Sequence, residues 1–412
     1  MTQPGPADAP GRRAADPRRW PWWVQVLAVY AVARVVSAVV LVVVARAQMA
    51  NPWTPASPGY LEFTGLMWDA GWYRQIAADG YPAELPRGPD GTVQQNAWAF
   101  FPLFPLLVRG LVALTGAPWH AAGPLLALGL GAVAVLLVHA AVRLGAPRAV
   151  RAWPGLPLAT VALVAAAPAG PVLQVAYTES LALALVAGTL VLLIRRRYPA
   201  AALTVLALGF TRAVALPMAV VVLVHAVARL RRARAGGERV GRSDVLGLVG
   251  LLAAAGTSGL VWPLICATVT GVPDAYLQTQ AAWRGRPDVV PVLPWLDVAR
   301  WLWGDAGTFV LLVVLVAVGA LLLSPPARRL GPELQAWTAG YLGYLVGVIE
   351  PGTSLVRFGM LAFPLGAVLA GAVRSPSARR VWLGALLVAG VALQVAWIWV
   401  LWRLTPPSGW PP

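Results

Sequence analysis

The stretch Trp20–Met49, WPWWVQVLAVYAVARVVSAVVLVVVARAQM, decides the fold class. A helix needs about 20 apolar residues to cross the hydrocarbon core of a bilayer, and the run from 21 to 46 is long enough. Trp22 and Trp23 add the aromatic anchor that is typical of a membrane interface. The run is too long for the apolar region of a signal peptide and lacks a convincing cleavage site. We therefore expect the first transmembrane helix here.

The composition extends this expectation to the whole chain. Of its 412 residues 59% are hydrophobic and only 12% are charged, which is typical of a membrane protein with many spans. The net charge of +16 comes from arginine alone and lies in clusters between apolar runs, so we expect membrane lipids rather than nucleic acid as partners. Cys266 is the only cysteine, so no disulfide framework or thiolate metal site can form within the chain, and the three histidines show no metal-ligand spacing.

Ten further crossings are predicted, which makes an all-α bundle of about eleven spans. They lie at 120–142, 152–170, 174–194, 199–212, 214–229, 245–270, 307–324, 332–349, 354–373 and 380–402. Both flanks of the short pair between 199 and 229 are basic, so this pair must turn back near Thr211 and Arg212. The apolar segment 100–109 contains two prolines and is predicted to be interfacial or re-entrant rather than a full crossing.

Arginine placement predicts the orientation, because loops on the cytoplasmic side are rich in Arg. With the N-terminus inside, the arginine clusters fall inside: 143–151, 195–197, 229–242, 328–329 and 374–380. Most acidic residues then fall outside, although they were not used to set the orientation: Glu62, Asp69, Asp79, Glu84, Asp90, Glu179, Asp274, Asp288, Asp297, Asp305 and Glu350. The composition is typical of a GC-rich bacterial genome, so the expected location is the bacterial plasma membrane.

The expected organisation is one transmembrane domain, 21–402, with two long extracytoplasmic loops. The first loop, 47–119, is predicted to carry short interfacial helices, and the second covers 271–306. A Pro-, Ala- and Arg-rich tail, 1–20, is predicted to be disordered and cytoplasmic. The end of the chain, 403–412, is predicted to be an extracytoplasmic tail.

The most informative polar stretch is 66–82, LMWDAGWYRQIAADGYP, in the first loop. Read as a helix, it places Trp68, Trp72 and Ile76 on one apolar stripe and Asp69 with Tyr73 on the adjacent stripe. The tryptophans would then lie in the headgroup layer, and Asp69 would face the head of a lipid-linked substrate. Aspartate is also a favoured N-cap residue, so spacing alone leaves both the catalytic and the capping role open.

Other candidate residues lie at the predicted outer ends of later helices. Tyr177 and Glu179 occur in Tyr177-Thr178-Glu179-Ser180, where the carboxylate could bind a substrate or simply favour the helix dipole. Arg212 and Arg357 are outward arginines that could hold a phosphate through paired hydrogen bonds, or could pair with an outer carboxylate. Arg34 lies near the middle of the first span and requires a partner or a water-filled cleft.

The ordered set of these motifs resembles the PIG-V-like mannosyltransferases, which are membrane glycosyltransferases of the GT-C type. The matching pieces are Trp68-Asp69, Ala77-Ala78-Asp79-Gly80-Tyr81, Phe100-Phe101-Pro102-Leu103-Phe104-Pro105-Leu106, Tyr177-Thr178-Glu179-Ser180, Thr211-Arg212, and Arg357 with Phe363-Pro364-Leu365. They cover 66 to about 366. The chain departs from the family pattern at Ala70-Gly71-Trp72 and at Ala213-Val214-Ala215, and the latter replaces a polar Ser-Asn-Gly.

The resemblance implies a GT-C-like bundle that transfers mannose from a polyprenyl-phosphate donor on the extracytoplasmic face, with inversion at the sugar carbon. It implies Asp69 as general base, and Arg212 or Arg357 as the group that stabilises the departing lipid phosphate. Tyr177 and Glu179 would orient donor or acceptor. Trp68 and Tyr73, which flank Asp69, are assigned to substrate binding as well. A divalent cation near Asp69 is compatible with this chemistry but not required by it.

Three other function classes stay open at the level of sequence. The first is a lipid or glycolipid transporter or flippase, which Arg34 and the short pair at 199–229 favour and the absence of an internal repeat disfavours. The second is a GT-C enzyme that uses another lipid-linked sugar, and the third is a non-catalytic scaffold. The identity of the acceptor is not encoded in any motif that we recognise.

Overall fold

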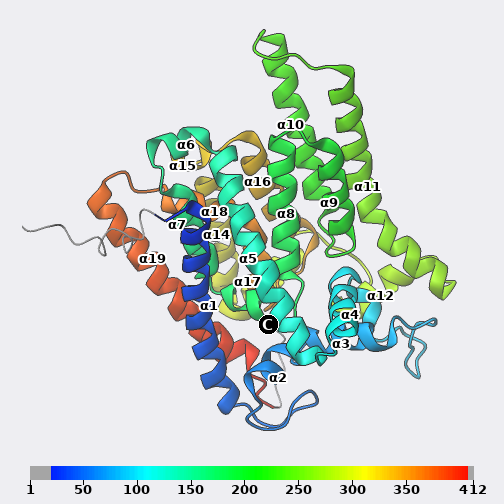
Figure 1. Cartoon of the computed structure of the whole chain (residues 1–412). Coiled ribbons are helices and arrows are strands. Elements are labelled where there is room, and N and C mark those ends of the chain that lie inside the picture. The colour runs from blue at the N-terminus through cyan, green and yellow to red at the C-terminus, as the bar shows by residue number, and fades with distance from the viewer. Residues whose placement is uncertain (1–19, 407–412) are drawn as a thin grey trace, which may run out of the picture.

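The computed structural model describes residues 20–406 and is helical throughout, with no strand in that range. This confirms the predicted all-α class. The predicted disordered tail, apart from Trp20, lies outside the described residues, and so do residues 407–412 of the predicted outer tail. Figure 1 shows the helices packed side by side, with one helical hairpin projecting beyond the rest.

Within residues 20–406, five helical stretches are long and apolar enough to cross a membrane. They are α1 (Trp22–Arg46), α5 (Trp119–Gly145), α11 (Arg242–Thr270), Leu293–Arg328, which contains α13 (Leu293–Trp303), α14 (Gly307–Leu322) and α15 (Pro325–Arg328), and Pro376–Trp402, which contains α19 (Pro376–Trp397) and a final π-helical turn. Their length and composition are compatible with an integral membrane protein. The first of them coincides with the span predicted at 21–46.

The remaining helices of the described chain are shorter or more polar. They are α2 (Tyr60–Gly65), α3 (Asp69–Asp79), α4 (Leu103–Thr115), α6 (Pro147–Ala152), α7 (Leu156–Ala165), α8 (Glu179–Ile194), α9 (Tyr198–Gly209), α10 (Ala215–Arg234), α12 (Ala275–Arg284), α16 (Pro332–Val348), α17 (Leu355–Phe358) and α18 (Pro364–Ala370), with short 3-10 turns between them. The first predicted outer loop does carry short helices, namely α2 and α3. The proline-rich piece at 100–109 forms the short helix α4 rather than a long one.

Two predicted crossings differ clearly from the helices that form. The stretch 152–170 contains only the ten residues of α7, which extend about 15 Å along the helix axis. The stretch 354–373 is divided into α17, a 3-10 turn at Gly359–Ala362, and α18, which starts at Pro364. In both stretches prolines and glycines at the boundaries end the helical hydrogen bonding, a break that an apolar composition does not reveal.

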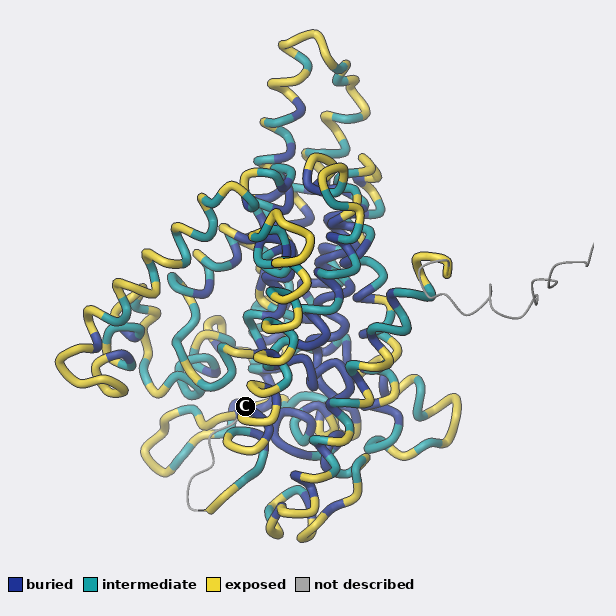
Figure 2. Tube along the Cα trace, turned by 90° about the vertical axis from the view of Figure 1, so that its left-hand side faces the viewer, coloured by how far each residue is buried: buried dark blue, intermediate teal, exposed yellow. Residues whose placement is uncertain are grey.

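The core of the bundle surrounds α8. This helix is apolar on every side, as expected of a helix that is covered all round, and it packs against α5 and α9. Outside this centre, α9 packs on α11 and α10 packs on α16. Figure 2 shows buried residues concentrated along these central helices, while the peripheral helices expose one side.

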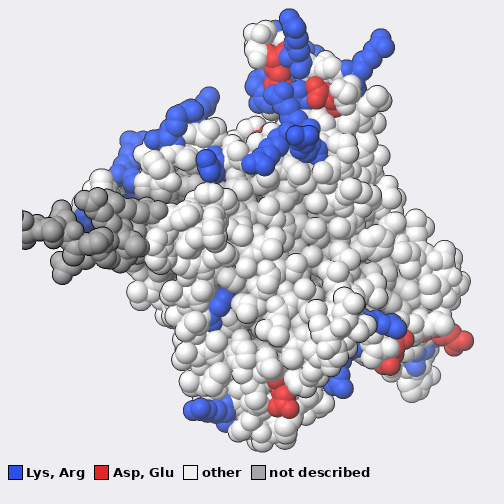
Figure 3. All heavy atoms as spheres, viewed as in Figure 1, with Lys and Arg blue, Asp and Glu red and all other residues white. Residues whose placement is uncertain are grey.

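The projecting hairpin is formed by α10 and α11 and carries many arginines. Arg229 joins its two helices near their connecting loop: this side chain is fully buried and binds Glu238 of the loop at 2.6 Å and Asp244 of α11 at 3.0 Å. Figure 3 shows Arg side chains gathered at the tip of this hairpin and over α6, above a broad face with almost no charge. At the opposite end, α9 and α10 are joined by a turn at 210–214, which confirms the turn predicted near Thr211 and Arg212.

Arg34, whose partner the sequence does not identify, is satisfied inside the bundle. Its guanidinium donates to the carbonyl of Gly170 and, at 2.6 Å, to that of Ala165. The guanidinium also lies 5.4 Å from the centre of the Tyr30 ring. Because α7 ends at Ala165, the carbonyl of this residue has no partner within the helix, and Arg34 and, at 3.4 Å, Gln394 donate to it instead.

We expect Arg34→Met to destabilise the fold, because it leaves the Gly170 carbonyl buried without its donor. Loss of a hydrogen bond to a charged group costs roughly 1.5–3 kcal/mol, and the free energy of unfolding in detergent should fall by that amount. Arg46→Met, at the exposed end of the same helix, is the matched control and should unfold like the parent. Equal stability of the two variants would contradict this role of Arg34.

Candidate functional site

The predicted apolar stripe of Trp68, Trp72 and Ile76 requires a helix that includes Trp68. The helix α3 begins one residue later, at Asp69. Trp68 precedes the helix and is buried, and its indole N–H donates to the carbonyl of Trp402 at 2.6 Å. Trp72 stacks on Phe100 with ring centres 5.7 Å apart. Trp68 is therefore buried in the protein, which corrects its predicted place in the headgroup layer, whereas Trp72 is half-buried and its membrane position stays a prediction.

Asp69 does not act as a helix cap. It is the first residue of α3 rather than the N-cap, and no side-chain capping bond forms at this helix start. Its Oδ2 instead accepts a hydrogen bond from Arg357 Nη2 at 2.5 Å, across 288 positions of sequence. Between the two roles that spacing left open, the structure thus removes the capping role, and Asp69 belongs to a tertiary ion pair.

Glu179 completes a group of four charges that we call the charged cluster: Asp69, Glu179, Arg212 and Arg357. The carboxylate of Glu179 is fully buried at the start of α8, and its Oε1 accepts from Arg212 at 2.8 Å and from Arg357 at 2.9 Å. Two guanidinium and two carboxylate groups balance in charge, which is what burial of ionic groups requires. Four segments far apart in sequence thereby meet at one point.

Aromatic rings enclose the charged cluster. The Arg212 guanidinium lies 4.5 Å from the centre of the Phe358 ring, and that of Arg357 lies 5.0 Å from the Tyr177 ring. Tyr177 also accepts a hydrogen bond at 3.2 Å from the backbone N–H of Asp69. Tyr73, one turn along α3 from Asp69, shares a hydrogen bond of 3.3 Å with Thr178. These contacts fix the rotamers of the cluster without adding a charge.

Trp68 holds Asp69 in place through an unfavourable backbone conformation. Its φ of +56° with ψ of −125° lies in a region that non-glycine residues rarely adopt, at a cost of roughly 1–3 kcal/mol. The indole contacts that compensate this cost are the hydrogen bond to Trp402 and the tilted packing on Trp53, with ring centres 5.2 Å apart. A strained residue directly before a buried carboxylate is typical of a functional site.

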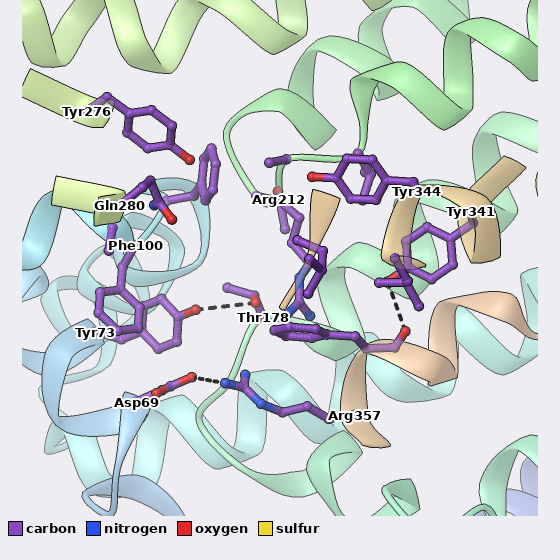
Figure 4. A pocket seen from close by; sticks show the side chains of 18 residues that line it. Asp69, Tyr73, Phe100, Thr178, Arg212, Tyr276, Gln280, Tyr341, Tyr344 and Arg357 are labelled. Atoms are coloured by element: carbon purple, nitrogen blue, oxygen red, sulfur yellow. Dashed lines mark hydrogen bonds and ion pairs between the residues drawn. The ribbon is translucent and has the colours of Figure 1, made fainter. Parts of the chain in front are cut away.

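A cavity of about 200 Å³ opens beside the charged cluster (Figure 4). Asp69, Arg212 and Arg357 line its charged end, and Asp69 is the only carboxylate among the lining residues that the structure describes. The other walls are mainly aromatic: Tyr73, Phe100, Phe101, Tyr276, Tyr341, Tyr344 and Phe358, with the amide of Gln280 beside them. A charged end next to aromatic walls suits a ligand that carries both an anionic group and a polyhydroxyl ring.

The sequence-predicted site residues divide into two groups. Asp69, Tyr73, Arg212 and Arg357 line the cavity, whereas Trp68, Tyr177 and Glu179 lie behind this lining and support it. Sequence reasoning missed the residues of α12 and α16 that form the far walls. Tyr276 and Gln280 occur four residues apart, a spacing that predicts one helix face within a region that was treated as a loop.

The carboxylate of Asp69 is set up to exchange a proton. Burial raises the pKa of Asp69 above its ordinary value, while the positive charge of Arg357 opposes that shift. Oδ2 is held by Arg357, and Oδ1 forms no hydrogen bond within residues 20–406. One oxygen is therefore available to a group inside the cavity. Burial and the nearby carboxylates also raise the pKa of Tyr73, which stays a neutral hydroxyl.

The site combines a proton acceptor with two cations that can bind an anion, and these are the groups that acyl-, phosphoryl- or glycosyl-transfer chemistry needs. Across the described residues no group of three or more His, Cys, Asp or Glu side chains comes close enough to hold a metal ion. No family model matches the chain, and no curated protein matches it.

We expect Glu179→Gln to lower the free energy of unfolding strongly, because two buried arginines then share one carboxylate. Breaking a buried ion pair from one side costs roughly 3–5 kcal/mol. Adding Arg212→Met to this variant removes the excess positive charge and should recover part of the loss, measured by denaturation in detergent. If the double variant is less stable than Glu179→Gln alone, the charge balance is not what stabilises the cluster.

Proposed function

We propose that this protein is an inverting glycosyltransferase that moves a sugar, mannose by the family resemblance, from a polyprenyl-phosphate donor to an acceptor hydroxyl. The observation that carries the proposal is the position of Asp69, alone among carboxylates in the cavity lining and next to Arg212 and Arg357. The resemblance of the motifs, although no family model matches, names the same residues. The aromatic walls are compatible with a sugar ring.

The proposed reaction uses each of these groups once. The acceptor oxygen attacks the anomeric carbon, and its proton passes to Oδ1 of Asp69. The bond between that carbon and the phosphate oxygen breaks on the opposite face, and its electron pair leaves with the lipid phosphate. Arg212 and Arg357 stabilise the negative charge on the leaving phosphate, as preorganised cations do in other transfer reactions.

Donor binding would also prepare the base. In the structure Arg357 is bound to Asp69 at 2.5 Å, and this pairing opposes the increase in the pKa of Asp69 that burial causes. A phosphate diester that enters the cavity offers Arg357 a second anion. When Arg357 binds the phosphate, its interaction with Asp69 weakens. The proton affinity of Asp69 then increases. Binding of the donor first, and of the acceptor second, follows from this competition.

A single carboxylate supports inversion in one step. Retaining enzymes place a second carboxyl group about 5–5.5 Å from the first to act as a nucleophile. Glu179 is the other carboxylate of the charged cluster, but it is fully buried and both arginines bind its Oε1. It is therefore suited to hold the two arginines rather than to attack a sugar.

The proposal includes a GT-C-like bundle of about eleven crossings in a bacterial plasma membrane, with the N-terminus and the arginine-rich hairpin in the cytoplasm. The charged cluster then lies at the extracytoplasmic end, where lipid-linked donors present their sugars. Support comes from the separation in Figure 3 between the basic hairpin tip and the opposite end of the bundle. Helices that are too short to cross the membrane alone, such as α7, would form a crossing together with the segment that follows them.

The two features that favour the transporter alternative, Arg34 and the short pair at 199–229, both have structural partners. Arg34 was a candidate for a charged residue in a transport pathway, but two backbone carbonyls of the bundle bind its guanidinium. The short pair of helices α9 and α10 places Arg212 in the charged cluster rather than along a pathway through the bundle. Arg34 thus has a structural role within the bundle, and only the turn that carries Arg212 contributes to the candidate site.

We expect Asp69→Asn to abolish sugar transfer, with a rate loss of roughly 10²–10⁴-fold, because the amide cannot accept the proton. The assay uses membranes that contain the full chain and a labelled polyprenyl-phospho-sugar, and the donor should accumulate. Glu84→Gln, an exposed carboxylate of the same loop, is the matched control and should transfer like the parent. Transfer by Asp69→Asn at the parental rate would exclude Asp69 as the base.

The pH dependence of transfer should follow the ionisation of Asp69. The base works only when deprotonated, so activity is complete above its pKa and is lost as the pH falls through it. Because burial raises that pKa, the acid limb of kcat/KM should lie above the range of an ordinary aspartate, which titrates near ~3.9. A profile that stays flat throughout the acidic range would contradict this assignment.

A further inference from the structure

A second cavity, of about 580 Å³, lies on the other face of α3 from Asp69 and Tyr73. We call it the Trp53 groove. It is bounded by the loop before α2 and by the side of α3 that carries Gly71, Gln75 and Ala78. These positions follow the i, i+4, i+7 spacing of one helix face, so the same short helix separates this groove from the charged cavity. Its volume is in the range of ligand pockets.

Two tryptophans form the walls of the Trp53 groove, and both are held rigidly. The side-chain carbonyl of Asn51 accepts from the backbone N–H groups of Trp53 at 2.9 Å and of Thr54 at 3.0 Å, which fixes the loop. The indole of Trp53 lies directly on Gly71, where an added Cβ would come within 2.8 Å of its ring. Trp72, which also lines the groove, is held by Phe100.

The polar side chains of the Trp53 groove are free to bind a ligand. Arg74, Gln75 and Asp79 line it and are exposed, and within residues 20–406 none of their side chains forms a hydrogen bond or ion pair. Together they offer several planar donors and acceptors: a guanidinium, an amide and a carboxylate. Elsewhere in this loop polar side chains are used locally, as when Asp90 accepts from Thr92 at 2.7 Å.

We propose that the Trp53 groove binds a neutral carbohydrate, the glycan part of the acceptor. Rigid indole faces suit the apolar face of a sugar ring, and planar amide, guanidinium and carboxylate groups suit its hydroxyls. The single positive charge of Arg74 is balanced by Asp79, so the groove favours an uncharged polyhydroxyl over a phosphate. That the bound glycan belongs to the acceptor rests on the proposed function; that a carbohydrate binds there does not.

The two cavities differ in size and in charge, and each suits a different part of the substrates. The charged cavity is about a third the size of the groove and holds the cations that suit a phosphate. The larger groove lacks a carboxylate near any buried arginine, so it has no catalytic pair. An acceptor anchored there by sugars away from its reactive hydroxyl would gain affinity without disturbing Asp69. The Trp53 groove is therefore a binding site and not a second catalytic centre.

The test measures binding of the neutral trisaccharides mannotriose and maltotriose to the full chain in nanodiscs by titration calorimetry. We expect at least one to bind the parent, Trp53→Ala to weaken that binding at least tenfold, and Gln75→Ala to weaken it severalfold. Gln75 is exposed, so its variant does not depend on the packing that Trp53→Ala removes. Trp23→Ala, an exposed indole at the start of α1, is the control and should bind like the parent.

The proposal would be overturned by no binding of either trisaccharide to the parent, or by parental affinity in both Trp53→Ala and Gln75→Ala. Loss of binding in Asp69→Asn would overturn it as well, because it would place the sugar in the charged cavity. Tight binding of anionic vesicles that Arg74→Ala removes, without trisaccharide binding, would also overturn it in favour of a lipid headgroup. Asp69→Asn that binds the sugar like the parent supports the groove. Failure of the transfer function alone would appear in the transfer assay and leave this binding unchanged.

Discussion

The ion pairs of Arg357 are the interaction on which the candidate site depends. One guanidinium binds Asp69 at 2.5 Å and Glu179 at 2.9 Å, and so joins the first loop to the start of α8 and to the broken helix at 355–370. Charges buried in an apolar bundle are stable only when they are paired, so the segments that carry them must meet. This requirement explains why α8 begins where it does and why the turn between α9 and α10 carries Arg212. It also explains why an otherwise apolar chain retains four charges at one end of its core.

The support for this cluster comes from the far end of the chain. Trp68 adopts a strained backbone, and the carbonyl of Trp402 receives its indole N–H at 2.6 Å. Next to this contact, the side chain of Gln48 exchanges two hydrogen bonds of 3.0 Å with the backbone of Leu404. The last turn before Leu404 is π-helical, a form that is frequent at functional sites. The segment at 398–404 therefore closes the bundle over α3, and the position of Asp69 depends on residues more than 300 positions away.

The sequence predicts those features of the fold and the candidate site that depend on local sequence, and it misses those that depend on contacts between distant residues. Composition predicted the all-α class, basic flanks predicted the turn at Thr211 and Arg212, and the motifs named Asp69, Glu179, Arg212 and Arg357. Periodicity gives the faces of a helix but not its neighbour, so the stripe of Trp68 and Trp72 was assigned to the membrane although Trp68 is buried in the protein. The walls that Tyr276 and Tyr341 provide were missed for the same reason. Strain at Trp68 has no signal in the sequence, because it depends on contacts made by distant residues.

In the proposed function the short helix α3 would link recognition to chemistry, because it lines both cavities. Its eleven residues present Asp69 and Tyr73 to the charged cavity and Gly71, Gln75 and Ala78 to the Trp53 groove. Gly71 is needed because Trp53 lies on it, and a larger residue would push the loop and the helix apart. Trp72 lies between the two cavities, since it lines the groove and stacks on Phe100, which lines the other. A ligand that presses on the indoles of the groove therefore acts on the same helix that carries Asp69. The Asp69 carboxylate can move little without losing its hydrogen bond of 2.5 Å to Arg357.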